Sequence, residues 1–243
     1  MQQVVKKDKT IAPLVNVSLF SGLVERVVSR AEELPGIACF YGPSGYGKTF
    51  SATYSANKYR AYCVQIKSVW TRKKLCEEIL KEIGLTPERT IPAMVDQIAE
   101  ELVGSKRPLI IDEADFLVTK SMIEVVRDIY ESCYAPIILI GEENMPGNLA
   151  KWERVHNRIL AMEKAKPASL EDTKHLARLY CPGVELADDL LTAVHEAAVG
   201  CTRRICVSLD RVREFAASRG ASALTRKDYT DELFTGRPAG RGQ

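Results

Sequence analysis

A glycine-rich stretch early in the chain has the residue types that hold phosphate. Residues 42–49 read GPSGYGKT, which fits Gly-x-x-x-x-Gly-Lys-Thr, and they lie between an expected strand and an expected helix. Glycines at this spacing let successive backbone N–H groups face one concavity, and the start of a helix adds partial positive charge. The pattern in this context predicts a P-loop that binds nucleotide phosphates, and a chance glycine-rich turn is the weaker interpretation.

Individual residues of this loop have separate expected roles. Lys48 is expected to reach the β- and γ-phosphates and to assist catalysis, and the Thr49 hydroxyl is expected to ligate Mg²⁺. Tyr46 is expected to border the nucleotide. The predicted nucleotide-binding residues of the loop are Gly42, Pro43, Ser44, Gly45, Tyr46, Gly47, Lys48 and Thr49.

Two acids follow an apolar run farther along the chain. Residues 108–113 read PLIIDE, so the carboxylates fall at the carboxyl end of an expected strand, the edge where open parallel sheets bind ligands. Asp112 is expected to hold Mg²⁺ together with Thr49. Glu113 is expected to polarise the attacking water, because that task needs a second acid facing the γ-phosphate. Hydrolysis of ATP is therefore expected as well as binding.

Composition limits the remaining possibilities. The 243 residues, 46% of them hydrophobic, suffice for one α/β domain and a small second domain. The 34 basic and 32 acidic residues nearly cancel, so any surface that binds nucleic acid must be local. Seven cysteines without Cys-x-x-Cys spacing favour a reducing compartment, and the chain shows neither a signal peptide nor a run of about 18 apolar residues. We expect a cytoplasmic protein without a membrane partner.

The order of expected elements indicates an α/β fold with a parallel sheet. Four short apolar runs, IACFYG, AYCVQI, PLIID and PIILIG, alternate with helical stretches. A first helix is expected from Ser18 to the Pro35-Gly36 pair, and helices alone are expected at 170–181, 186–198, 201–218 and 225–234. The expected organisation is a flexible basic arm (1–17), an α/β nucleotide-binding domain (18–167), a helical domain (168–234) and a disordered tail (235–243).

The segment IKSVWTRKKL, residues 66–75, is unusually basic. It follows the expected second strand and opens a helix, where cations oppose the helix dipole. A nucleic-acid backbone would compensate them, although a solvated helix face is the simpler interpretation. Trp70 either packs under the loop or contacts DNA. The predicted DNA-binding residues are Lys67, Trp70, Arg72, Lys73 and Lys74.

Several segments together resemble a known family. GPSGYGKT and LIIDEAD resemble AAA+ ATPases, whose fold has a parallel sheet and a small C-terminal helical lid domain. More narrowly, IILIGEENMPGNLAKWERVHNRIL and GCTRRICVSLDRVREFA are similar to the phage Mu transposition protein B family. This resemblance implies an ATP-dependent, sequence-non-specific DNA-binding ATPase in the cytoplasm of a bacterial host. Such a protein forms a helical filament or ring on double-stranded DNA and delivers it to a transposase, and hydrolysis controls disassembly.

The resemblance also implies roles for particular residues. Arg158 in VHNRIL matches a finger that reaches the γ-phosphate held by the adjacent subunit, and Arg203 matches a nucleotide-contacting arginine, with Arg204 as the alternative. A polar residue just after the strand IILIG is expected to contact the nucleotide. Asn144 is the predicted contact, although Glu142 stands directly after the glycine of that strand. The Mu protein has a helix-turn-helix domain where this chain has residues 1–17, so DNA contact is expected from the ATPase domain.

Two other classes remain open at the level of sequence. A secretion-associated or signalling P-loop ATPase of related architecture would share the phosphate site without binding DNA. A small-molecule kinase would need an acceptor pocket, for which the sequence gives no pattern. Nucleotide-dependent retention on DNA separates the first hypothesis from both.

Overall fold

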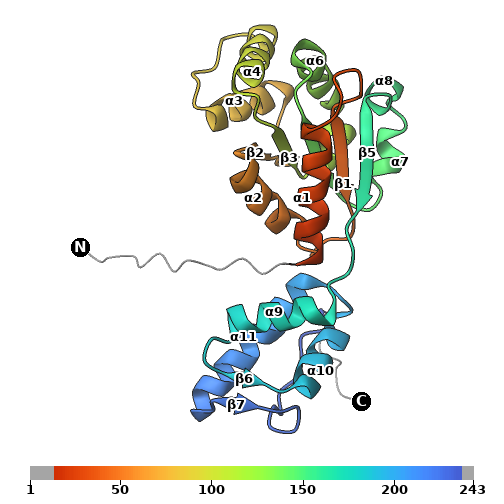
Figure 1. The fold of residues 1–243 in the computed structure, drawn as a ribbon. Helices are drawn as coiled ribbons and strands as arrows, with labels where there is room; N and C mark the ends of the chain where they lie inside the picture. Colours follow the sequence, from red (N-terminus) through yellow and green to blue (C-terminus); the bar gives the residue numbers. More distant parts are fainter. Residues whose placement is uncertain (1–13, 237–243) are drawn as a thin grey trace, which may run out of the picture. The chain divides into compact units, whose positions relative to one another are not determined.

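The computed structural model describes residues 14–236 and divides them into two compact units (Figure 1). The N-terminal unit is Asn16–Lys166. The C-terminal unit contains the described residues 14–15 and 167–236. Most of the predicted arm and of the predicted tail lies outside the described residues.

A five-stranded parallel sheet forms the centre of the N-terminal unit, with strand order β2-β3-β4-β1-β5. The strands are β1 (Ile37–Tyr41), β2 (Tyr62–Gln65), β3 (Leu109–Asp112), β4 (Ile137–Gly141) and β5 (Ile159–Lys164). Every residue of β3 and β4 is buried, which explains why these runs are apolar without alternation. The α/β class and the parallel sheet are confirmed.

Helices cover both faces of this sheet because successive strand residues point to opposite sides. Ala38 and Phe40 pack with α1 and α2, whereas Ile37 and Cys39 pack with α3, α4 and α6. The long helices are α1 (Val15–Val28), α2 (Lys48–Tyr59), α3 (Arg72–Ile83), α4 (Ile91–Ser105) and α6 (Ile123–Cys133). Three short helices lie at strand ends: α5 (Asp115–Thr119), α7 (Met145–Leu149) and α8 (Glu153–His156).

The first helix differs from its prediction at both ends. It begins at Val15 rather than Ser18, because Asn16 and Val17 are buried and the Val15 N–H donates to Asp172 Oδ1 at 3.0 Å. It ends at Val28 rather than near Pro35, because residues 29–34 present no buried face. Residues 15–17 therefore do not belong to a flexible arm.

The C-terminal unit has three helices among its described residues: α9 (Leu170–Tyr180), α10 (Asp188–Ala198) and α11 (Thr202–Arg219). A reciprocal capping box between Ser169 and Asp172 starts α9. Two short parallel strands, β6 (Glu185–Leu186) and β7 (Ala223–Leu224), pair beside them.

The helix expected at 225–234 is wrong. Asp228 Oδ2 accepts from both the Thr225 N–H and the Thr225 hydroxyl, at 2.8 and 2.7 Å. This side chain thereby closes a local turn that competes with helix formation. Tyr229 is buried directly after the turn, so packing holds the segment in a non-helical path.

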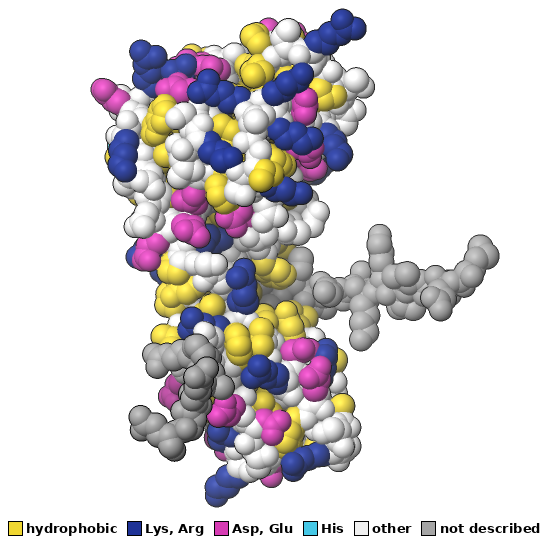
Figure 2. All heavy atoms as spheres, turned by 180° about the vertical axis from the view of Figure 1, so that it is seen from behind, with side chains coloured by type: hydrophobic (Ala, Val, Ile, Leu, Met, Phe, Trp, Pro, Cys, Tyr) yellow, Lys and Arg dark blue, Asp and Glu magenta, His cyan; other side chains and the backbone are white. Residues whose placement is uncertain are grey.

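Charges of both signs are intermixed on the face shown in Figure 2. On the face in Figure 2, Lys and Arg side chains stand among Asp and Glu side chains without a large area of one sign. This distribution matches the near-neutral composition. Among residues 14–236, none of the helices has both the length and the apolarity needed to cross a bilayer.

Candidate active site

The loop GPSGYGKT connects β1 to α2 at the carboxyl edge of the sheet. Gly45 and Gly47 adopt left-handed φ angles of 83° and 81°, which glycine reaches without steric cost. At Gly42 the backbone passes so close to the segment after β5 that a Cβ would lie 3.0 Å from the Ala165 Cβ. The glycine spacing therefore gives the local shape that the sequence predicts.

Lys48 is held inside this loop. Its Nζ donates to the carbonyl oxygens of Gly42 at 2.6 Å and Pro43 at 2.9 Å. Burial lowers the pKa of Lys48, and the carboxylates of Asp112 and Glu113 oppose that change. Because weak neutral acceptors satisfy the ammonium group, phosphate oxygens could replace them with a gain in electrostatic energy.

Thr49 and Asp112 meet at the end of β3. The Thr49 hydroxyl donates to Asp112 Oδ2 at 2.8 Å, and Asp112 is buried. A hydroxyl beside a carboxylate fits the oxygen ligands that Mg²⁺ uses when phosphates and waters complete its shell. In the described part of the chain no group of three or more His, Cys, Asp or Glu could hold a metal ion alone. Bound Mg²⁺ would neutralise charge on the β- and γ-phosphates.

Glu113 has a strained backbone beside this pair. Its φ is 56°, a left-handed value that non-glycine residues seldom adopt, and its N–H donates to Asp112 Oδ1 at 2.9 Å. Burial raises the pKa of Glu113, and the neighbouring Asp112 carboxylate raises it further. A carboxylate with a raised pKa is a stronger base, which suits the predicted activation of water.

Two further acids join this edge of the sheet: Asp115, which was not predicted as a site residue, and Glu142, which the sequence left as the alternative to Asn144. Asp115 Oδ2 accepts from the Glu142 N–H at 2.7 Å, and burial raises the pKa of Asp115. The Glu142 carboxylate also raises it, and Glu142 is close enough to Lys48 to oppose the fall of its pKa. The sequence signal was present in the third acid of LIIDEAD.

Asn144 follows Glu142 by two residues and lies at the start of α7. It caps α7 without a side-chain hydrogen bond and is exposed. Glu142, rather than Asn144, therefore belongs to the group of acids at this edge of the sheet. A nucleotide contact by Asn144 stays a prediction.

Asn16 supports the loop from the first helix. Its Nδ2 donates to the carbonyl oxygens of Tyr46 at 2.8 Å and Lys166 at 2.7 Å, and its Oδ1 accepts from the Lys166 N–H at 2.8 Å. Asn16 is buried, so these bonds hold the P-loop against the end of β5. The sequence pattern did not predict this role, because Asn16 falls within the predicted arm.

The side chains of Ser44 and Tyr46 differ in environment. Ser44 is exposed, whereas the Tyr46 ring packs against the core cluster that includes Phe20 and Phe40. Contact between the Tyr46 ring and nucleotide stays a prediction.

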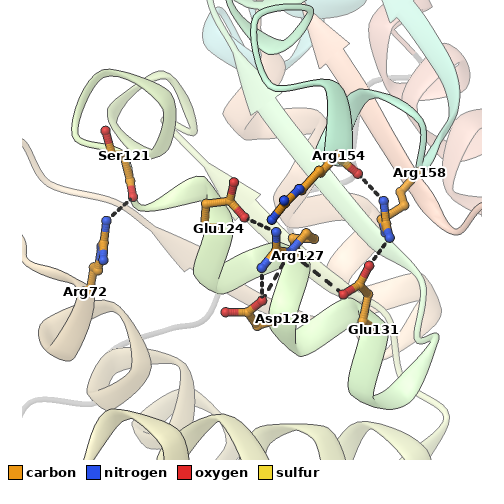
Figure 3. A network of polar contacts seen from close by, with 8 residues as sticks. All are labelled: Arg72, Ser121, Glu124, Arg127, Asp128, Glu131, Arg154 and Arg158. Atoms are coloured by element: carbon orange, nitrogen blue, oxygen red, sulfur yellow. Dashed lines mark hydrogen bonds and ion pairs between the residues drawn. The ribbon is translucent and has the colours of Figure 1, made fainter.

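Arg158 lies between α8 and β5, away from the P-loop residues in sequence. Its guanidinium forms an ion pair with Glu131 of α6 and donates to the carbonyl oxygen of Arg154 (Figure 3). The side chain is 32% exposed. Arg158 is thus at the surface of the N-terminal unit and is bound to its own chain.

The two arginines at the start of α11 have different environments. Arg203 is exposed, and Arg204 is partly buried beside Gly236. The nucleotide contact of Arg203 stays a prediction.

The basic segment 66–75 forms the end of β2, a turn and the start of α3. Trp70 is only 8% exposed and belongs to the core, which supports packing under the loop, and contact of its ring with DNA stays a prediction. Lys67 and Lys73 are exposed. Arg72 is also exposed, but it donates to the Ser121 carbonyl oxygen at 3.0 Å.

The charge conflict expected at the start of α3 is partly resolved within the chain. The Thr71 hydroxyl accepts from the Lys74 N–H at 3.3 Å and caps the helix. Lys74 itself pairs with Glu78 at 2.7 Å and with Glu77 at 3.7 Å. An external anion is therefore less necessary here than the sequence suggested. Lys120, which was not predicted, reaches the Trp70 carbonyl oxygen at 3.5 Å and adds a cation beside the segment.

The sequence and the fold of this chain are similar to those of known nucleotide-binding proteins. Residues 31–149 match the family model described as an AAA domain. The chain has the AAA+ P-loop NTPase fold. No curated protein sequence matches it significantly.

Solved structures with the same fold come from archaea and bacteria. The Aeropyrum pernix ORC2 protein, in its ADPNP and ADP complexes, has a TM-score of 0.70 at 12% identity and aligns 91% of this chain with 68% of its own. The A. pernix ORC1 protein in complex with DNA has a TM-score of 0.60 at 18% identity, with 88% of this chain and 62% of its own aligned. The Thermotoga maritima RuvB Holliday junction branch migration motor has a TM-score of 0.58 at 20% identity, covering 86% of this chain and 64% of RuvB.

These likenesses establish the AAA+ fold. The chain spans about two thirds of the length of these proteins. The narrower resemblance to the phage Mu transposition protein B family is not supported by these matches and stays a hypothesis.

Proposed function

We propose that this protein is an ATP-dependent, sequence-non-specific DNA-binding ATPase that assembles on duplex DNA and presents it to a transposase. The observation that carries the ATPase part is the convergence of Lys48, the Thr49–Asp112 pair and strained Glu113 at one sheet edge. These groups supply the phosphate contact, the metal ligands and the base that phosphoryl transfer to water needs.

Hydrolysis follows from the separate tasks of these side chains. Lys48 would exchange its loop carbonyl contacts for phosphate oxygens and offset the charge that develops there. Glu113 would accept a proton from the attacking water, and its raised pKa makes that transfer more favourable. Asp115 holds the Glu142 backbone and so keeps the ends of β3 and β4 together.

Binding to DNA is proposed from the basic segment and from two structural relatives. ORC1 is described in complex with DNA, and RuvB is described as a branch migration motor. In this chain Lys67, Arg72 and Lys73 are exposed, and Lys120 lies beside them. If every subunit of an assembly presents this surface, the repeated cations would bind DNA phosphates even though each chain is nearly neutral overall.

Assembly is proposed from Arg158. A guanidinium supplied by the neighbouring subunit would stabilise the γ-phosphate charge and make hydrolysis depend on contact between copies. The partly exposed position of Arg158 beside β5 is compatible with that role. Delivery to a transposase rests on the sequence resemblance alone.

Two observations favour the alternative of a secretion-associated or signalling ATPase that does not bind DNA. Lys74 is fully paired on α3, and Arg72 already has a backbone acceptor, as on an ordinary solvated helix face.

Electron microscopy and sedimentation with random-sequence duplex DNA, with ADP or a non-hydrolysable ATP analogue, separate the two functions. We expect regular assemblies on DNA only with the analogue. The absence of DNA retention in both nucleotide states would leave an ATPase without a DNA function.

A further inference from the structure

A network of two arginine side chains, three carboxylates and one backbone carbonyl joins α6 to the segment before β5 (Figure 3). Its carboxylates, Glu124, Asp128 and Glu131, all come from α6, which also contributes Arg127. The second arginine side chain is Arg158, which follows α8, and Arg154 on α8 contributes its backbone carbonyl oxygen. The interacting side chains are therefore two guanidinium groups and three carboxylates, all from one chain.

Arg158 has two partners in this network. Its Nη2 pairs with Glu131 Oε1, and its Nη1 donates to the Arg154 carbonyl oxygen. The two charged side chains are 32% and 38% exposed, so water and an approaching ligand can reach the ion pair. An anion that binds Arg158 must therefore compete with Glu131.

Arg127 can serve as a second partner for Glu131. It pairs with Glu124 and with Asp128, each at 2.5 Å, and its Nε lies 3.9 Å from Glu131 Oε2. The two residues are one helical turn apart on α6, which is the spacing at which side chains of opposite charge meet. If Arg158 left, Glu131 would keep a cation within reach.

We propose that Glu131 is a positioning residue that holds Arg158 in the single chain and releases it to the nucleotide phosphate of a second copy. Arg127 then takes Glu131 as its partner, so the exchange leaves no carboxylate unpaired. This inference rests on the proposed role of Arg158 between subunits. The new element is that the ion pair between Arg158 and Glu131 within one chain sets the protein concentration at which hydrolysis begins.

The expected size of the effect follows from exposure. Ion pairs between partly exposed side chains change equilibria by about 2- to 5-fold. Glu131→Gln keeps the shape of the side chain but removes its charge, so it should lower the half-activating protein concentration by this factor. The hydrolysis rate per subunit at saturation should not change, because Arg158 reaches the phosphate in both proteins.

The experiment measures ATP hydrolysis against concentration of the full chain, with Mg²⁺ and random-sequence duplex DNA, while light scattering follows assembly. Asp128→Asn is the matched control, because it removes one charge from the same helix and from the same arginine network without touching Arg158. We expect a shift for Glu131→Gln and a smaller shift or none for Asp128→Asn. Equal shifts in both variants would overturn the proposal.

A second comparison tests whether the effect passes through Arg158. Glu131→Gln combined with Arg158→Ala should assemble at the same concentration as Arg158→Ala alone. A lower assembly concentration for the double variant would contradict the positioning role. Undiminished hydrolysis by Arg158→Ala alone would instead refute the role of Arg158 between subunits, on which this inference depends.

Discussion

The two halves of the proposed catalytic machinery differ in how complete they are within one chain. Around the P-loop, Lys48, Thr49, Asp112 and Glu113 already lie together, and the backbone holds them through Gly45, Gly47 and the end of β3. Arg158 instead binds Glu131 of its own chain at a partly exposed surface.

This difference indicates where control can act. The P-loop half is fixed by short-range geometry and burial, so changes there should abolish or slow chemistry at any protein concentration. The Arg158 half depends on an exchange of partners, so changes there should alter how activity depends on contact between copies. The predictions below test this contrast.

The broadest effect is expected at Lys48, where one change should impair ATP binding, assembly and therefore hydrolysis. Lys48→Ala should weaken ATP binding by about 100-fold or more, because a charge-assisted contact of about 3 kcal/mol is lost. DNA-dependent assembly should disappear with it. Calorimetric titration of the full chain measures the affinity, and Lys58→Ala on the same helix is the control, since Lys58 bonds to Ser21 instead. Similar ATP affinity in both variants would contradict the phosphate role.

Glu113 should affect turnover without affecting binding. Glu113→Gln should lower the hydrolysis rate by about 10²- to 10⁴-fold, as expected for a lost general base, and its DNA complexes should last longer under hydrolysing conditions. Equal DNA lifetimes for the variant and the unmodified protein would count against this role.

The pH profile gives a related signature of Glu113. The base works when deprotonated, and its pKa is raised mainly by burial. Activity of the unmodified protein should therefore rise with pH through a range above that of an ordinary glutamate. The residual activity of Glu113→Gln should lack this rise. If the hydrolysis rate instead rises with pH around the pKa of an ordinary glutamate, burial does not raise the pKa of Glu113 in the working enzyme.

Arg158 should behave as a residue supplied by a neighbour. Arg158→Ala should reduce saturated hydrolysis by about 10²- to 10³-fold, the loss typical of one transition-state charge contact. Mixed one to one with Glu113→Gln protein, it should recover part of the activity, because about a quarter of head-to-tail interfaces then combine an intact acid with an intact arginine. No recovery, although light scattering shows mixed assemblies, would contradict action between subunits.

The smallest effects are expected in the basic segment. Lys67→Ala and Lys73→Ala should each weaken DNA binding a few-fold and make the log–log salt dependence shallower by about one unit per lost phosphate contact per bound subunit. Lys74→Ala should change less, because Glu77 and Glu78 already neutralise Lys74. Fluorescence anisotropy with an ATP analogue measures this. Unchanged slopes for Lys67 and Lys73 would identify the segment as a solvated surface.

The sequence alone determined the features that depend on short-range rules. The spacing of Gly42, Gly45 and Gly47 before a helix specifies the loop, because few backbone paths fit those residues. The apolar runs ending in Asp112 and Gly141 specify parallel strands buried on both faces. A local pattern is sufficient in such cases, since the residues that matter are neighbours in the chain.

Tertiary structure decided the features that depend on distant partners. Trp70 is buried because α3, β2 and their neighbours enclose it, which a cluster of surrounding charges does not reveal. Asn16 reaches Tyr46 and Lys166 across 30 and 150 residues of sequence, and Glu131 meets Arg158 only after β4 and the segment to β5 have folded. Hydrogen bonds and ion pairs of this kind leave no periodic signal in sequence, because their geometry exists only when the sheet and its covering helices have assembled.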